Sequence, residues 1–144
     1  MNDDRVPVQP VNIVFRTVAD WNVYGVAGAL EHRSFIRDKR QPANFPYTEM
    51  TYTGFGGVLL VSDVMGTPMA YDLSCPVERR RNVRVFINDE AEHLAECPEC
   101  GSRYNVFSLM GYPVSGEAAD HGYALRRYRV TQGAEGQDYR TVRF

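Results

Sequence analysis

Long hydrophobic runs are absent from this 144-residue sequence. The longest apolar stretch is Val58-Leu59-Leu60-Val61, whereas a transmembrane helix needs about 20 apolar residues. Residues 1–7 are polar and acidic, and they lack the apolar segment of a secretory signal peptide. The sequence therefore predicts no transmembrane segment and, in the chain as given, no export signal.

The sequence also lacks an excess of charge of either sign. Sixteen basic residues stand against 18 acidic ones, for a net charge of −2, whereas a nucleic-acid-binding domain normally carries a basic stripe. Catalytic and nucleotide-binding motifs are missing as well, since the glycine-rich segment 54–57 precedes a predicted strand instead of following one. We therefore expect a protein that is not an enzyme and that binds no nucleic acid.

Cysteine and histidine are scarce. Three cysteines are an odd number, which fits neither a complete disulfide framework nor a four-cysteine zinc site. The three histidines, His32, His93 and His121, show no ligand spacing to one another, although His93 lies on the approach to a cysteine. A metal site, if the chain has one, must therefore be built around the cysteines.

All three cysteines lie in two short loops that both begin Cys-Pro. The first reads Cys-Pro-Val-Glu at residues 75–78, and the second reads Cys-Pro-Glu-Cys-Gly at residues 97–101. Two loops of this kind are a common way to hold a metal ion or an iron–sulfur cluster. These two loops are therefore the candidate functional site of the chain.

The hydrophobic pattern has a period of two, which is typical of strands. In residues 83–87 it places Val83, Val85 and Ile87 on one face. Further β-rich runs lie at residues 11–18, 57–61, 69–73, 93–96, 104–107, 125–130 and 139–144. We predict turns at residues 88–90 and 133–136 and one helix within residues 29–40. The pattern predicts a single all-β domain of antiparallel strands, with each Cys-Pro loop at a hairpin tip.

The second loop admits three interpretations. A thioredoxin-type active site needs a helix after the cysteine pair, but Gly101, Ser102 and a β-rich run follow. A rubredoxin-like knuckle would point backbone N–H groups and both thiolates at one metal ion. The third interpretation is a buried or oxidised cysteine pair in a tight turn.

A hairpin between the two loops would bring them side by side. Each loop then offers a residue three positions after its first cysteine, so that the set is Cys75, Glu78, Cys97 and Cys100. Zinc accepts one carboxylate together with thiolates, which makes this a candidate tetrahedral site. In the alternative, Glu78 faces water beside Arg79.

Two basic segments, Arg-Asp-Lys-Arg at 37–40 and Arg-Arg-Arg at 79–81, are the strongest charge runs. Such runs are usually solvated turns. For residues 79–81 the alternatives are that they offset the charge of a thiolate site or attract an acidic partner.

The second loop continues as Gly-Ser-Arg-Tyr-Asn-Val at 101–106, Gly-Tyr-Pro-Val-Ser-Gly-Glu-Ala at 111–118 and Leu-Arg-Arg-Tyr-Arg-Val at 125–130. This succession resembles the second half of a Rieske-type [2Fe–2S] ferredoxin domain, and the resemblance covers roughly residues 55–130. It implies a Rieske-like domain over residues 11–144, whose antiparallel sheets carry a two-loop subdomain at about 71–118. In that family the loops read Cys-x-His and Cys-x-x-His.

The chain departs from the family at both histidine positions, where Val77 and Cys100 stand. The usual two-histidine cluster is therefore excluded. The resemblance implies that Cys75 and Cys97 are metal-site residues. It also implies that the hydroxyls of Ser102 and Tyr104 bond to cluster or cysteine sulfur. We expect zinc or no metal; the alternative is a [2Fe–2S] cluster on Cys75, Cys97, Cys100 and an unusual fourth ligand.

The sequences that this chain most resembles are small envelope lipoproteins of Bacteroidetes. That resemblance implies a flexible tether at residues 1–10, a lipid anchor in the precursor and a periplasmic or outer-membrane location; the alternative is the cytoplasm. The function it implies is that of a non-enzymatic, divergent Rieske-like protein with an unknown protein partner. The alternatives are an electron-transfer ferredoxin and an interaction module fixed by zinc or a disulfide.

Overall fold

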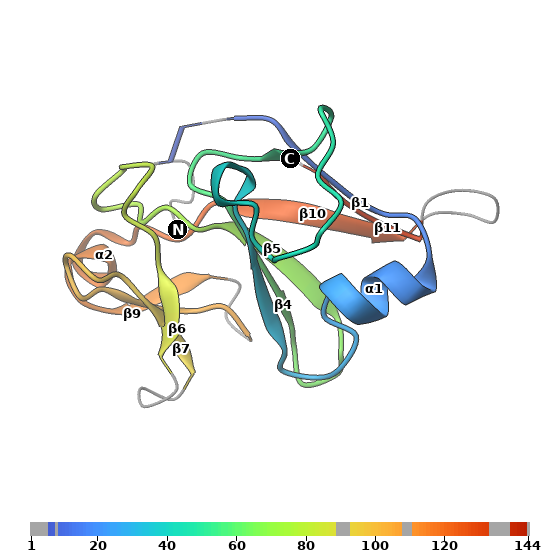
Figure 1. The fold of residues 1–144 in the computed structure, drawn as a ribbon. Coiled ribbons are helices and arrows are strands. Elements are labelled where there is room, and N and C mark those ends of the chain that lie inside the picture. The colour runs from blue at the N-terminus through green and yellow to red at the C-terminus, as the bar shows by residue number, and fades with distance from the viewer. Residues whose placement is uncertain (1–5, 8, 89–92, 108–110, 133–138, 144) are drawn as a thin grey trace.

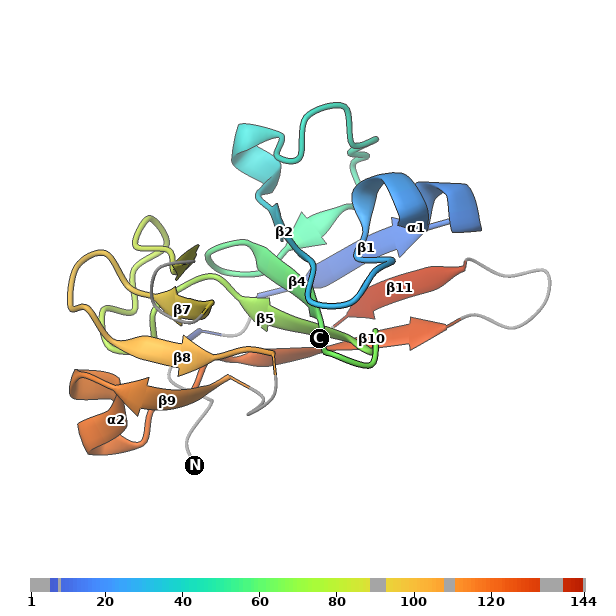
Figure 2. The ribbon, with the colours of Figure 1, turned by 90° about the horizontal axis from the view of Figure 1, so that it is seen from below.

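The computed structural model describes residues 6–7, 9–88, 93–107, 111–132 and 139–143. Antiparallel strands dominate the described residues, which confirms the predicted all-β class. The strands form two sheets, one large and one small, that lie side by side in both ribbon views (Figures 1 and 2). No described helix is long and apolar enough to cross a membrane.

Seven strands form the larger sheet, in the order β2-β4-β5-β10-β11-β1-β3. Every neighbouring pair in it is antiparallel. Its members are β1 (Val11–Phe15), β2 (His32–Phe35), β3 (Tyr52–Thr53), β4 (Val58–Ser62), β5 (Pro68–Asp72), β10 (Arg127–Gln132) and β11 (Arg140–Arg143).

The smaller sheet has four strands in sequential order, namely β6 (Phe86–Asn88), β7 (Leu94–Glu96), β8 (Arg103–Asn105) and β9 (Tyr112–Ser115). The short helix α2 (Glu117–His121) follows β9 and lies beside it (Figure 2). The first Cys-Pro loop lies between β5 and β6, and the second connects β7 to β8. The topology therefore carries the chain from the larger sheet through the first loop into the smaller sheet.

Strand β4 is buried on both faces and separates two hydrophobic clusters. Leu59 and Val61 belong to a cluster that includes all the buried side chains of the smaller sheet, whereas Val58 and Leu60 belong to a second cluster rich in aromatic residues. Alternate side chains of a strand point to opposite faces, so the apolar run at 58–61 serves both clusters. Fully burying such a side chain contributes roughly 1.5–3 kcal/mol.

The prediction of a helix within residues 29–40 is wrong. That segment contains β2 and the short 3-10 helix η1 (Arg37–Lys39), and Phe35 of β2 pairs with Val58 of β4. Pairing with a buried strand outweighs local helix propensity. The helix α1 (Val18–Tyr24) lies earlier in the chain, and its N-cap is Thr17, whose hydroxyl accepts the Asp20 N–H.

The predicted strands are otherwise found, with shifted ends. In the run 83–87, Val83 and Val85 are buried and Ile87 is half-buried, but β6 begins only at Phe86. The predicted turn at 88–90 lies almost wholly outside the described residues, as does the one at 133–136. Within the predicted tether, Val6 is buried and its carbonyl accepts a hydrogen bond from Arg126, so the chain contacts the domain at that point.

Candidate metal centre

The two Cys-Pro loops adopt the same turn. The N–H of Arg79 donates to the carbonyl of Cys75 at 2.8 Å, and the N–H of Gly101 donates to that of Cys97 at 3.0 Å. Arg79 and Gly101 both have left-handed backbone conformations, with φ of 53° and 70°. Each loop therefore closes four residues after its first cysteine, and residues at the same distance from that cysteine are equivalent.

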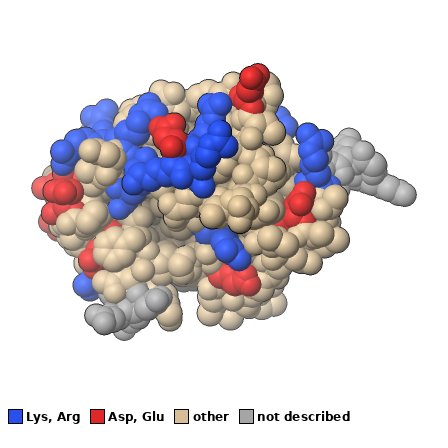
Figure 3. Space-filling view, in the orientation of Figure 1, with Lys and Arg blue, Asp and Glu red and all other residues tan. Residues whose placement is uncertain are grey.

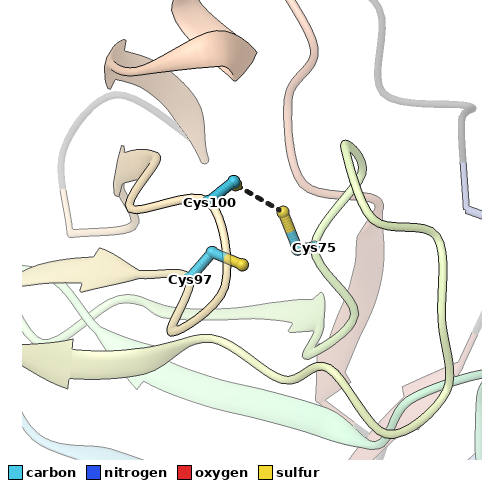
Figure 4. A group of neighbouring side chains, drawn as sticks. All are labelled: Cys75, Cys97 and Cys100. Atoms are coloured by element: carbon cyan, nitrogen blue, oxygen red, sulfur yellow. Dashed lines mark hydrogen bonds between the residues drawn. The ribbon is translucent and has the colours of Figure 1, made fainter.

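The loops bring the three cysteine sulfurs together, as their predicted pairing requires. All three Sγ atoms lie within 4.8 Å of one another, and those of Cys75 and Cys100 are 3.7 Å apart (Figure 4). In a tetrahedral zinc site with Zn–S bonds of about 2.3 Å, two sulfurs are about 3.8 Å apart. The three side chains are free thiols, with Cys75 and Cys97 buried and Cys100 half-buried.

Two buried hydroxyl groups contact the sulfurs. The Tyr104 hydroxyl lies 3.2 Å from Cys75 Sγ, and the Cys100 thiol donates to Ser102 Oγ at 3.2 Å. Ser102 Oγ also accepts the Ala118 N–H at 3.1 Å, which ties the second loop to α2. Both hydroxyls therefore contact cysteine sulfur, and Ser102 Oγ does so as the acceptor.

Burial raises the pKa of the Cys75 thiol and raises that of Cys97 to about 12. The backbone N–H groups of Val77 and Glu78 face the Cys75 sulfur and act in the opposite direction, and the equivalent N–H groups of the second loop do the same for Cys97. These N–H groups have the arrangement predicted for a knuckle. At neutral pH the two buried thiols stay protonated unless a cation replaces their protons.

Glu78 and Val77 occupy the remaining positions of the first loop. Glu78 is equivalent to Cys100, but its carboxylate accepts a hydrogen bond from Arg80 at 3.1 Å and lies outside the group of sulfurs. Val77 packs against the first hydrophobic cluster and offers no ligand atom. The assignment of Glu78 as fourth ligand therefore stays a prediction. None of the described histidines joins the cysteine group.

Sequence reasoning missed one buried carboxylate at the base of the first loop. Asp72, at the end of β5, accepts hydrogen bonds from the N–H groups of Phe55, Gly56 and Ser74 and, at 2.6 Å, from the Tyr128 hydroxyl. Burial raises the pKa of Asp72, and these four donors oppose that shift. The only signal in the sequence was a carboxylate at the end of an apolar strand.

Comparisons with known proteins identify no relative. No family model matches the chain, and neither a curated protein nor a solved structure matches it. Any function must therefore be argued from the geometry of the site itself.

Proposed function

We propose that this chain is a non-enzymatic, Rieske-like protein in which Cys75, Cys97 and Cys100 hold one structural metal ion, zinc in the first place. The observation that supports this proposal is the gathering of three free thiols from two separate loops within 4.8 Å. The bound ion would fix the two loops to each other. It would thereby link the segment that leads into β6 to the connection between β7 and β8. A location in the cell envelope remains part of the proposal through the resemblance alone.

Several features support the Rieske-like part of the proposal. The loops adopt equivalent turns, a small antiparallel sheet lies beside a larger one, and hydroxyls of Ser102 and Tyr104 contact sulfur. Hydroxyl groups bonded to sulfur also tune the reduction potential of iron–sulfur clusters. That contact favours the second candidate function, a ferredoxin with a [2Fe–2S] cluster on the three cysteines and one further ligand.

Metal analysis and a visible spectrum of the anaerobically purified protein test the proposal. A colourless protein with one zinc per chain is the expected result, and a coloured protein with two irons would establish the ferredoxin instead. A protein that retains neither metal after expression in zinc-supplemented medium contradicts both. Because no imidazole stands at either family position, we expect no Rieske-type paramagnetic signal after dithionite reduction, even after cluster reconstitution.

Three variants identify the ligands. Cys100→Ser should lower the zinc content, because a neutral hydroxyl is a much poorer zinc ligand than a thiolate. Glu78→Gln should weaken zinc retention against a chelator if its carboxylate completes the site. Glu99→Gln is the matched control, since Glu99 is an exposed carboxylate in the second loop. Equal retention by both glutamine variants would exclude Glu78 as the fourth ligand.

A further inference from the structure

A hollow of about 140 Å³ lies next to the first Cys-Pro loop and is lined by three arginines. Arg37 comes from η1, whereas Arg81 and Arg84 lie on the segment that leads from the loop to β6. The fold thus brings together Arg37 and Arg81, which belong to the two basic segments at 37–40 and 79–81. Lys and Arg side chains gather over η1 and this loop in the space-filling view (Figure 3). We call this hollow the arginine pocket.

Each guanidinium group is held in place by a neighbour that leaves most of its N–H donors unused. Arg84 Nε donates to the carbonyl of Gly56, Arg81 lies 4.9 Å from the Phe55 ring centre, and Arg37 lies 5.5 Å from that of Tyr52. Such contacts orient an arginine without neutralising it. Within the described ranges, none of the three arginines forms an ion pair with a carboxylate.

Hydrogen bonds to the buried Asp72 hold the floor of the arginine pocket in place. The floor consists of residues 53–57, and the buried Asp72 accepts the N–H groups of Phe55 and Gly56. A Cβ on Gly56 would lie 2.8 Å from the backbone nitrogen of Ser74, so the floor packs directly on the base of the cysteine loop. Because Asp72 accepts the N–H groups of Phe55 and Gly56, these two backbone donors are not available to a ligand, and the three arginines supply the positive charge of the lining.

We infer that the arginine pocket binds a tetrahedral oxyanion, specifically a phosphate or phosphoryl group. The planar fork of a guanidinium group matches two oxygens of a phosphate, and charge-assisted bonds of this kind are among the strongest that side chains form. Among the described residues of the lining, Asp38 is the one acid, against three arginines. The volume suits a single phosphate better than a drug-sized or nucleotide ligand, which needs roughly 300 Å³ or more.

Calorimetric titration of inorganic phosphate into the full chain tests this inference, at constant ionic strength maintained with chloride. Arg81→Gln and Arg84→Gln should each weaken phosphate binding about tenfold, the effect of losing one charge-assisted bond. Asp38→Asn should strengthen it, because an opposing charge is removed. Arg143→Gln removes the same charge at an exposed position of β11 that does not line the hollow, and it should change affinity less than about twofold.

A second arm distinguishes free phosphate from a lipid headgroup. Co-sedimentation with phosphatidic acid vesicles, compared with phosphatidylcholine vesicles, should depend on Arg81 and Arg84 if the headgroup enters the arginine pocket. The inference is overturned if wild-type protein saturates with neither probe, or if Arg143→Gln loses as much affinity as Arg81→Gln. Arg81 is exposed, so Arg81→Gln should keep the native circular dichroism spectrum.

Both arms are run on protein with and without chelator. Phosphate binding that survives metal removal supports the arginine pocket even if the metal proposal fails, because the pocket's arginines are not metal ligands.

Discussion

Tyr104 and Ser102 are buried polar residues whose hydroxyl groups meet sulfur. A buried hydroxyl without a partner is costly, and sulfur is a weak partner when it is a thiol. A metal-bound thiolate is a much better acceptor, because it carries negative charge. The two contacts are therefore worth more in a metal-loaded site than in a metal-free one.

This argument predicts that Tyr104→Phe lowers zinc affinity about tenfold, as the loss of a hydrogen bond to a metal ligand typically does. Tyr71→Phe is the matched control, because its hydroxyl donates at 2.8 Å to the carbonyl of Val106 in the same hydrophobic cluster. Both variants should lose about 1 kcal/mol of stability. Competition with a zinc chelator measures the difference, and equal affinities in the two variants would contradict the role given to Tyr104.

The raised pKa values of Cys75 and Cys97 predict a pH effect on the metal-free protein. A group whose pKa is higher in the folded state stabilises the fold below its unfolded pKa and loses that contribution as pH rises. The free energy of unfolding should therefore fall from about pH 8.5, the ordinary thiol pKa, towards pH 12. Urea unfolding at pH 7–10 with chelator and reductant measures the slope, which should be smaller in Cys97→Ser. An unchanged slope in that variant would assign the loss to other groups.

At the scale of elements, the two Cys-Pro loops have the same turn conformation but differ in the residue that closes the turn, which is Arg79 in the first loop and Gly101 in the second. Gly101 adopts the left-handed conformation without strain, whereas Arg79 adopts it at a cost because it carries a Cβ. The pairing of the loops could be predicted from spacing and from the Cys-Pro start, whereas the knuckle is one of three interpretations that the sequence leaves open. The strand ends and α1 could not, because register and strand pairing depend on distant residues such as Val58 opposite Phe35.

Gly101→Ala should therefore cost about 1 kcal/mol through backbone strain alone. No heavy atom lies within 4 Å of the added Cβ, so packing contributes nothing to this cost. Gly66→Ala is the control, since Gly66 also has a positive φ and open space around it but lies in the turn between β4 and β5. Urea unfolding should show similar losses, while chelator competition should show weaker zinc binding only for Gly101→Ala. Equal zinc affinity in both variants would mean that the turn does not shape the site.

For the whole molecule, the sequence indicates the all-β class and the cysteine loops because periodicity and short motifs are local. It does not indicate Asp72 as an anchor, nor that Arg37 would meet Arg81 and Arg84, because those contacts arise only when distant strands pair. The first hydrophobic cluster likewise joins Leu59 of the larger sheet to side chains of the smaller one. The two sheets therefore share a core, and the first Cys-Pro loop connects them, whereas the second lies within the smaller sheet.

Metal removal should consequently loosen the molecule unevenly. The smaller sheet has strands of three or four residues, whereas β4 is buried along its whole length between two clusters. A ligand that binds only the folded loops stabilises whatever must unfold to release it, here the hairpin of β7 and β8. We expect chelator to speed amide hydrogen exchange in β7 and β8 and to leave β4 and β5 protected.

Hydrogen-exchange mass spectrometry with zinc and with chelator measures this pattern, and Cys100→Ser should reproduce the chelator result without chelator. The variant is a necessary control, because it separates loss of the site from other effects of the chelator. If exchange rises equally in both sheets, the two sheets unfold as one cooperative unit. If it rises in neither, the site contributes nothing to the fold, and a structural role for the metal is excluded.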